Sequence, residues 1–393
     1  MKNPIIYLLI ASISLTTAGY HAHGQGQKGS LKVTKDKPGD ISLRLEVERA
    51  IDKGTKWLVQ QQSPEGYWGE PAYPAMTAMA LSSLLNQPGP KPEAQIKKGL
   101  EFLVSNVKSD GGIYNKGMTS YNTSLSMMAL MQSGDPAYKP IVRNARHFLI
   151  KHQTDIGTPG EADNEFDGGL GYTPDRGYAD LSNTYLALEA LHYSEQYLKN
   201  SPEHQLKMDL NWEMALEFIS KCQNRPESNP MEFAKNAPKE DRGGFVYFPG
   251  ESKAGEKELP NGKVALRSYA SMSYAGLLSF VYAKMDTDDP RIKAVREWLG
   301  NNYSVKENPG MGLQGLYYYY HTMGKALSIL GEETLVLPDG TKVDWRRDLV
   351  KQLFNMQDAK GFWNNENGRW WEKDPVLVTC YALMTLERVH ATL

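Results

Sequence analysis

The sequence of 393 residues has few cysteines, no cluster of positive charge and no long apolar run. Cys222 and Cys380 are its only cysteines, so a disulfide framework and a cysteine-based metal site are excluded. A single bridge between the two is left open. The 44 basic residues are balanced by 46 acidic ones without a basic run, which argues against nucleic acid or an anionic membrane surface as a partner.

An apolar run near the N-terminus, Ile5 to Thr17, is too short for a stable membrane span. Lys2 precedes the run and Ala22-His23-Gly24 follows it, as in a cleaved export signal. We therefore expect a signal peptide at residues 1–24 and a mature periplasmic or extracellular protein without stable membrane insertion. An uncleaved N-terminal anchor is the alternative interpretation. Residues 25–45 are expected to form a flexible leader, and residues 46–393 one large domain.

What the chain has instead is a repeat. A helix-like stretch runs into a turn with glycine and, in most copies, an aromatic residue, and a second helix-like stretch follows. The copies of the turn lie at residues 62–69, 110–114, 167–172, 243–247, 308–312 and 357–363, and the copy at 308–312 lacks the aromatic residue. A repeat of this period indicates stacked helix pairs that bury their apolar faces against neighbouring pairs.

The two helices of each pair differ in composition. The first carries charges on one side, as in residues 96–103 and 291–299, and the second is small and apolar on nearly every face, as in residues 75–85 and 123–130. A helix that is apolar all round is buried all round. We therefore predict an all-α fold, an (α/α)6 toroid with six amphipathic helices outside and six apolar helices inside.

The connections that depart from the repeat are long and polar. Residues 155–178 and 224–266 both join an outer helix to an inner one, so both are expected at the same end of the toroid, where long loops often carry function. Residues 334–343 are typical of a small β-hairpin and lie between helix pairs, hence at the opposite end.

The turns at 62–69 and 357–363, with Gln62 and Trp68 or Gln357 and Trp363, resemble the QW-type motifs of squalene and hopene cyclases. Over residues 46–390 the chain resembles the terpenoid cyclase and protein prenyltransferase superfamily. The resemblance implies a toroid with a central, aromatic-lined cavity for an isoprenoid-type ligand.

The catalytic motifs of that superfamily are not reproduced. Residues 286–289 read Asp-x-Asp-Asp, but they follow an inner helix and precede Pro290, so we interpret them as the cap of an outer helix. The prenyltransferase zinc site needs an Asp and a Cys beside its His. His321 lies in a fitting segment, but Arg267, Ser268 and Tyr269 stand where those ligands would be. No metal and no cofactor is therefore expected.

We expect site residues at the starts of inner helices and in the long loops, because both face the same end of the toroid. Asp180, His321 and Asp374 are candidate acid–base groups. Aromatic and polar side chains at comparable places are candidate ligand contacts, because an aromatic cavity can hold an isoprenoid or stack on a sugar. These are Tyr121, Arg267, Tyr269, Tyr274, Tyr318, Trp370, Trp371 and Glu372. The acidic loop with Asp155, Glu161, Asp163, Glu165 and Asp167 is expected to be solvated, because its spacing lacks a calcium-ligand pattern.

Three classes of function remain open. The first is a terpenoid cyclase-like enzyme, or a descendant that binds a small hydrophobic ligand. The second is a carbohydrate-active enzyme, in which Glu372 or Asp374 would face Asp180 or Asp241 across a cleft. The third is a non-catalytic scaffold that binds a glycan or a protein.

Overall fold

The computed structural model describes residues 38–173, 177–199, 208–260 and 262–393. The expected signal peptide, residues 1–24, and residues 25–37 of the expected leader lie outside the described residues. Helix α1 (Pro38–Gln60) begins within the segment expected to be the leader, and its Leu43 is buried in the core. Among the described residues, no helix combines the length and the apolar composition that crossing a bilayer requires.

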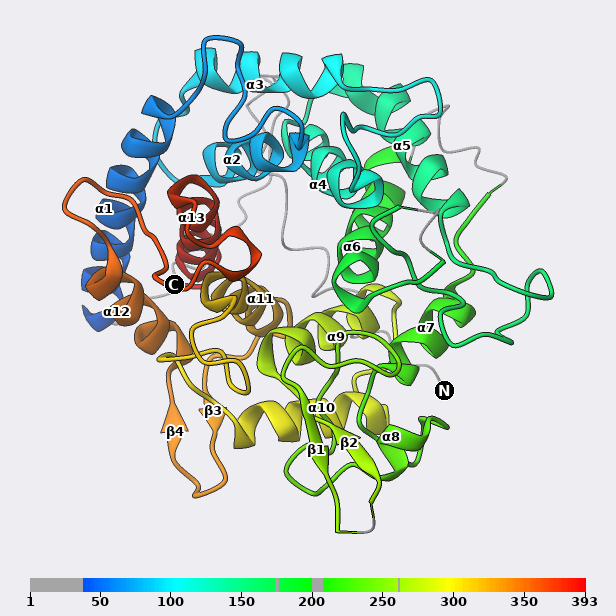
Figure 1. The fold of residues 1–393 in the computed structure, drawn as a ribbon. Helices are drawn as coiled ribbons and strands as arrows, with labels where there is room; N and C mark the ends of the chain where they lie inside the picture. The colour runs from blue at the N-terminus through cyan, green and yellow to red at the C-terminus, as the bar shows by residue number, and fades with distance from the viewer. Residues whose placement is uncertain (1–37, 174–176, 200–207, 261) are drawn as a thin grey trace, which may run out of the picture.

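The helices form two concentric rings, as the repeat predicts (Figure 1). The outer helices are α1, α3 (Glu93–Ser105), α5 (Lys139–Lys151), α7 (Trp212–Lys221), α10 (Pro290–Asn301) and α12 (Trp345–Met356). The inner helices are α2 (Pro74–Asn86), α4 (Thr119–Gln132), α6 (Leu181–Leu198), α9 (Ala270–Tyr282), α11 (Leu316–Ile329) and α13 (Pro375–Thr392). Each inner helix packs against the next, and α13 packs against α2, so the inner ring is closed. The prediction of an all-α toroid of helix pairs is confirmed.

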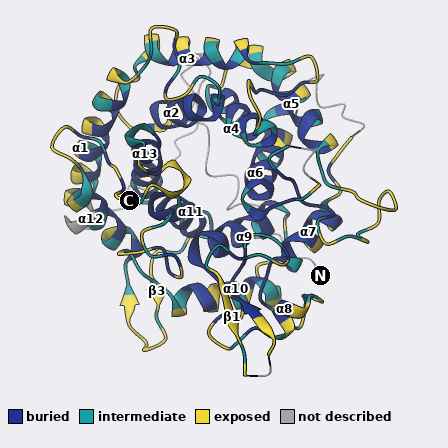
Figure 2. Ribbon diagram, in the orientation of Figure 1, coloured by how far each residue is buried: buried dark blue, intermediate teal, exposed yellow. Residues whose placement is uncertain are grey.

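Burial follows the composition of the two rings (Figure 2). Every residue of α2 from Pro74 to Leu84 is buried. The outer helix α3 buries only Ile96, Gly99, Leu100 and Leu103, which share one face at helical spacing. An outer helix therefore has one buried apolar face and one solvent-exposed face, whereas an inner helix is buried on nearly all sides.

The recurring turns join neighbouring pairs by a common set of contacts. Trp68 is fully buried; its indole N–H donates to the Leu58 carbonyl over 2.7 Å and its backbone N–H to Thr77 Oγ1 over 3.0 Å. Gln62 Nε2 donates to the carbonyl of Gly66 in its own turn and to that of Gln95 in the next outer helix, both over 2.9 Å. The turn thus fixes its own two helices to each other and to the following pair.

The same arrangement closes the ring. Gln357 Nε2 donates to the Gly361 carbonyl over 2.8 Å and to the Ala50 carbonyl of α1 over 3.0 Å. Gly361 has a φ of +104°, and a Cβ there would lie 2.5 Å from the Lys53 carbonyl oxygen. The last turn therefore contacts the first outer helix as the other turns contact theirs.

The connections differ in content between the two ends. The two long loops lie at the N-terminal ends of inner helices. The loop at 224–266 contains the short helix α8 (Glu232–Lys235) and an antiparallel hairpin of β1 (Glu256–Glu258) and β2 (Val264–Leu266). The sequence analysis did not predict this hairpin. The predicted hairpin at 334–343 is present as antiparallel β3 (Leu335–Val336) and β4 (Lys342–Val343). A 3-10 turn, η2 (Pro136–Tyr138), precedes α5, and another, η5 (Arg369–Trp371), precedes α13.

Two further expectations are settled by the fold. Asp289 caps α10, where its side chain accepts a hydrogen bond from the Arg291 backbone N–H over 2.8 Å, so the interpretation of residues 286–289 as a helix cap is confirmed. Cys222 and Cys380 are both buried and both free, so the bridge left open between them is not formed.

Candidate functional site

The hub of the inner ring holds a cavity of about 1170 Å³. Side chains from all six inner helices line it. The lining includes residues at the C-terminal ends of the inner helices, such as Asn86 of α2, Gln132 of α4 and Ile329 of α11. The two long loops lie at the N-terminal ends of inner helices, so the cavity reaches towards the end of the toroid opposite to them. A cavity of this size exceeds the usual volume of small-molecule sites.

Tyrosines form the floor of the cavity, near the N-terminal ends of the inner helices. Tyr121 and Tyr318 lie in the first turns of α4 and α11, and Tyr381 lies in α13 with its ring 5.9 Å from that of Tyr318. The hydroxyl of Tyr318 lies 3.3 Å from Ser182 Oγ. Burial raises the pKa of Tyr121 and Tyr318, so both hydroxyls stay protonated and act as neutral hydrogen-bonding groups.

A buried ion pair crosses the wall about two helical turns further along. Lys325 Nζ of α11 donates to both carboxylate oxygens of Glu189 of α6 over 2.9 Å, and the Tyr282 hydroxyl donates to Glu189 Oε1 over 3.1 Å. The two charged side chains are only 7% and 3% exposed. Burying such a pair carries a large desolvation cost, and removing either partner would leave the other charge buried without compensation.

Further ionisable side chains line the cavity, among them Lys139, His192, His321, Glu387 and Arg388. Glu387 Oε1 and His321 Nδ1 are buried without a hydrogen-bond partner among the described residues. Burial raises the pKa of Glu387 well above its usual range and lowers that of His321 well below its own, so burial favours the neutral form of both side chains. The guanidinium of Arg388 has no hydrogen bond and no ion pair within the described part of the chain.

Of the residues predicted from the sequence, Tyr121, Tyr318 and His321 line this cavity together. The others lie elsewhere. Tyr269 and Tyr274 are buried where α9 packs on its neighbours, and the ring of Tyr274 is 6.0 Å from that of Tyr319. Arg267 is exposed at the end of β2.

The predicted acids bind backbone groups at helix starts and do not line the cavity. Asp180 caps α6 and accepts from the backbone N–H of Asn183 over 2.9 Å and from its Nδ2 over 2.7 Å. Asp374 caps α13 by accepting from the Val376 N–H over 2.8 Å. Acidic side chains favour such positions because helix N-termini present unpaired donors and a positive dipole end.

Glu372 has the same kind of role across two elements. Its carboxylate is buried and accepts from the Tyr318 N–H over 2.9 Å, from the Tyr317 N–H over 3.3 Å and from Asn365 Nδ2 over 2.7 Å. It therefore ties the loop before α13 to the start of α11. Asp241, the partner considered for a carboxylate pair, is likewise buried and accepts from the Ser268 N–H over 2.8 Å.

Trp370 and Trp371 stand on the loop that Glu372 anchors. They are 42% and 50% exposed, with φ values of +55° and +66°. The Arg369 guanidinium lies 4.4 Å from the Trp370 ring, and Tyr73 meets Trp371 edge-on at 5.1 Å. The two indoles thus form an aromatic surface at the loop-bearing end of the toroid, separate from the cavity.

Asp180 provides a test of this structural role. Burial raises its pKa to about 6, against the lowering effect of hydrogen bonds from Asn183. Because the pKa of Asp180 is higher in the folded than in the unfolded protein, its contribution to the free energy of unfolding is fully present below the unfolded pKa near 4. That contribution is lost as pH rises through about 6. In Asp180→Asn the side-chain amide of Asn183, whose Oδ1 has no partner, can turn round and accept instead.

We therefore expect Asp180→Asn to gain about 3 kcal/mol relative to the parent protein between pH 4 and pH 7.5. Urea denaturation of both proteins across that range measures the difference. A difference that stays constant with pH would contradict the assigned burial of a charge at Asp180.

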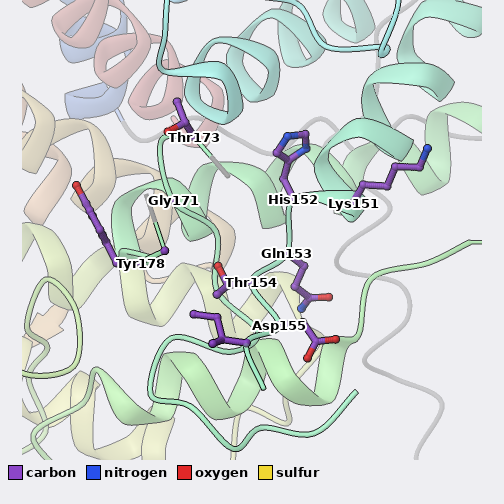
Figure 3. A pocket seen from close by; sticks show the side chains of 10 residues that line it. Lys151, His152, Gln153, Thr154, Asp155, Gly171, Thr173 and Tyr178 are labelled. Carbon is purple, nitrogen blue, oxygen red and sulfur yellow. The ribbon is translucent and has the colours of Figure 1, made fainter. Parts of the chain in front are cut away.

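A second, smaller pocket of about 210 Å³ lies beside the end of α5 (Figure 3). Two of its polar side chains are engaged: Gln153 Nε2 donates to the Gly168 and Asn211 carbonyls, and Asp155 accepts from the Gly160 N–H. The neighbouring Asp163 and Asp167 also accept from backbone N–H groups of this loop. These carboxylates are used to shape the acidic loop.

The sequence reasoning missed several ionisable residues of the cavity wall, among them Glu189, Lys325, Glu387 and Arg388. A signal for them was present. Glu189 interrupts the apolar stretch 184–191, and a charge in a helix that is buried all round must face a partner or a cavity. The starts of the inner helices and the long loops, where the predicted site residues lie, are at the other end of the toroid.

No family model matches the chain. No curated protein matches it either. Similar solved structures include the type II terpene cyclase MstE from Scytonema, with 10% identity, 89% of this chain and 99% of that chain covered, and a TM-score of 0.51. A variant of MstE in complex with geranylgeranyl dihydroxybenzoate, its substrate, has 10% identity, 90% and 99% coverage and a TM-score of 0.52.

An inactive variant of an α-1,6-mannanase from Salegentibacter sp., solved with α-1,6-mannotriose, is similar over 88% of this chain and 100% of that chain, with 11% identity and a TM-score of 0.56. At these identities the likeness concerns the fold alone. The chain has the α/α toroid fold, on which both a terpene cyclase and a glycan-cleaving enzyme are built.

Proposed function

We propose that this protein binds a small amphipathic molecule with an isoprenoid-type chain in the central cavity, and that it does so after export. The observation that carries the proposal is the cavity itself, which combines a volume of about 1170 Å³ with a tyrosine floor and an apolar wall. Export rests on the residues of the N-terminal segment 1–24.

The deeper wall of the cavity suits a flexible apolar chain. Its side chains there include Met79, Leu125, Leu186 and Met384. Methionine is unbranched and polarisable, so it adapts to ligands of irregular shape. Tyrosine faces add apolar contact and can stabilise positive charge. Burial of an isoprenoid against these groups would be driven by the hydrophobic effect.

The known structures support this choice in part. MstE is a toroid solved with a substrate that joins a geranylgeranyl chain to a dihydroxybenzoate. In the present cavity Glu387, whose pKa is raised by burial, is a group that could donate a proton to a bound ligand. The proposal concerns binding of an isoprenoid; turnover of the bound ligand is measured separately.

A glycan is the second candidate ligand. Amide and hydroxyl side chains gather at the mouth of the cavity, among them Asn86, Gln132 and Gln196, and two carboxyl groups, Glu189 and Glu387, line one space. A toroid mannanase binds α-1,6-mannotriose. Against this stands the tyrosine and methionine wall, which offers few hydrogen bonds to sugar hydroxyls.

Thermal unfolding with matched ligands separates the two candidates. We expect farnesol or geranylgeraniol to raise the Tm, because a ligand at a hundred times its Kd stabilises the folded state by about 2.7 kcal/mol. α-1,6-Mannotriose is expected to leave the Tm unchanged. Organic extraction of the purified protein, followed by mass spectrometry, would identify a ligand carried from the cell.

A cavity-filling variant makes the test specific. Leu125→Trp places an indole in the cavity and is expected to abolish the shift caused by farnesol. Leu313→Trp makes the same kind of change at a side chain that is exposed at the surface, and should keep the shift. Stabilisation by mannotriose but by neither alcohol would replace this proposal with the glycan alternative.

A further inference from the structure

The charged residues of the cavity do not balance. Lys325 and Glu189 form one pair, with both oxygens of Glu189 bound by the Lys325 amine. Arg388 also interacts electrostatically with Glu189, but it forms no ion pair within 4 Å with any described residue. Two cations therefore share one carboxylate, and the cavity carries an excess positive charge.

Other groups around Arg388 do not remove this excess. Glu387, its neighbour along α13, lines the same cavity, but it forms no ion pair with Arg388 within the described residues, its Oε1 has no partner, and burial raises its pKa well above the usual range. Arg388 also interacts with the hydroxyls of Tyr185, Tyr193 and Tyr282, which are polar but uncharged, and with a second cation, Lys325. A cation without an ion pair in a low-dielectric site favours an anion beside it.

The position of Arg388 along the cavity is also informative. On α13 it lies about two helical turns, or about 10 Å, beyond the floor residue Tyr381, in the direction of the C-terminal mouth. Lys325 has the same offset from the floor residue Tyr318 on α11. The cavity therefore changes from an apolar, tyrosine-floored depth to a positively charged zone nearer its mouth.

We propose that Arg388 binds the anionic head group, a carboxylate or a phosphate, of a ligand whose apolar part occupies the tyrosine-floored depth of the cavity. This inference rests on the proposed function, because it takes the cavity as the binding site. Guanidinium groups bind carboxylates and phosphates through two parallel hydrogen bonds, which suits a single arginine as a head-group receptor.

Three ligands with one chain test the head group: farnesol, farnesoic acid and farnesyl monophosphate. Isothermal titration of the full chain is expected to show at least one of the two anions binding about 10- to 100-fold more tightly than the alcohol. The anion whose affinity increases more over that of farnesol identifies the head group as a carboxylate or a phosphate. In Arg388→Gln that gain should disappear, while the affinity for farnesol changes less than about threefold.

Two further variants control for charge and for folding. Arg388→Lys keeps a cation and should retain part of the gain. Lys373→Gln removes one positive charge from an exposed side chain on the loop anchored by Glu372, and should change no affinity. Removal of an unpaired cation from the cavity wall is expected to leave the fold intact.

The outcomes separate this inference from the function on which it rests. Equal affinity of the parent protein for all three ligands would overturn the role of Arg388 and leave the isoprenoid site standing. Equal loss of all three ligands in Arg388→Gln would show that Arg388 only maintains the cavity. Absence of binding by all three in the parent protein would overturn both proposals.

Discussion

Replacement of Gly361 by alanine is expected to destabilise the toroid by about 3 kcal/mol or more. Gly361 has a φ of +104°, which L-residues rarely adopt, and an added Cβ would lie 2.5 Å from the backbone oxygen of Lys53. Backbone cannot move aside as a flexible side chain can, so the joint between the last turn and α1 would have to open. Urea denaturation monitored by tryptophan fluorescence measures the loss, because Trp363 is buried beside this joint.

Gly250 supplies a matched control for the contact. Its φ is +93°, close to that of Gly361, but a Cβ built on it would have no atom within 4 Å. Gly250→Ala therefore carries the backbone strain alone, about 1 to 2 kcal/mol. Equal losses in the two variants would contradict the close approach between the turn and α1.

Substitution of Lys325 by methionine is expected to cost about 3 to 5 kcal/mol, because it leaves the buried carboxylate of Glu189 without its cation. The double variant Lys325→Met, Glu189→Leu should recover most of that loss, since the carboxylate that lost its cation is then removed as well. Chemical denaturation of the parent protein, both single variants and the double variant gives the coupling free energy directly.

An exposed pair distinguishes burial from mere charge pairing. On α1 the Lys56 Nζ lies 2.7 Å from Asp52 Oδ2, and the two side chains are 72% and 57% exposed. Lys56→Met should cost less than about 1 kcal/mol, because water screens the charge that is left. If Lys325→Met lowered the free energy of unfolding as little as Lys56→Met does, water in the cavity would be solvating Glu189.

The fold could be predicted because the sequence repeats its joints. Gln62 and Gln357, the glycines that follow them and the buried Trp68 and Trp363 recur at corresponding places, and the structure shows each set making the same contacts. The alternation of amphipathic and wholly apolar helices then assigned each helix to a ring. The hairpin β1–β2 was missed because its residues are mostly polar and exposed on the strand Glu256–Glu258.

The site was harder to predict, because the same residue types serve two purposes. Asp180 and Asp374 stand at starts of inner helices, where an acid that caps a helix cannot be told from one that faces a cavity without the side-chain direction. Arg388 and Glu387 lie near the C-terminal end of the sequence, on an inner helix that the sequence marked only as apolar in its first half. Their shared space becomes apparent only when six helices meet.

The hydrogen bond from Gln357 to Ala50 has a consequence for how such a chain can be encoded. Since the final joint repeats the chemistry of the earlier ones, no helix pair serves as a cap and each has a neighbour on both sides. The pair at which the chain starts is then physically arbitrary, as long as the cyclic order of the pairs is kept. A circular permutant beginning at α3 and ending at α2 would bury the same surfaces, which is a freedom that linear helical repeats do not have.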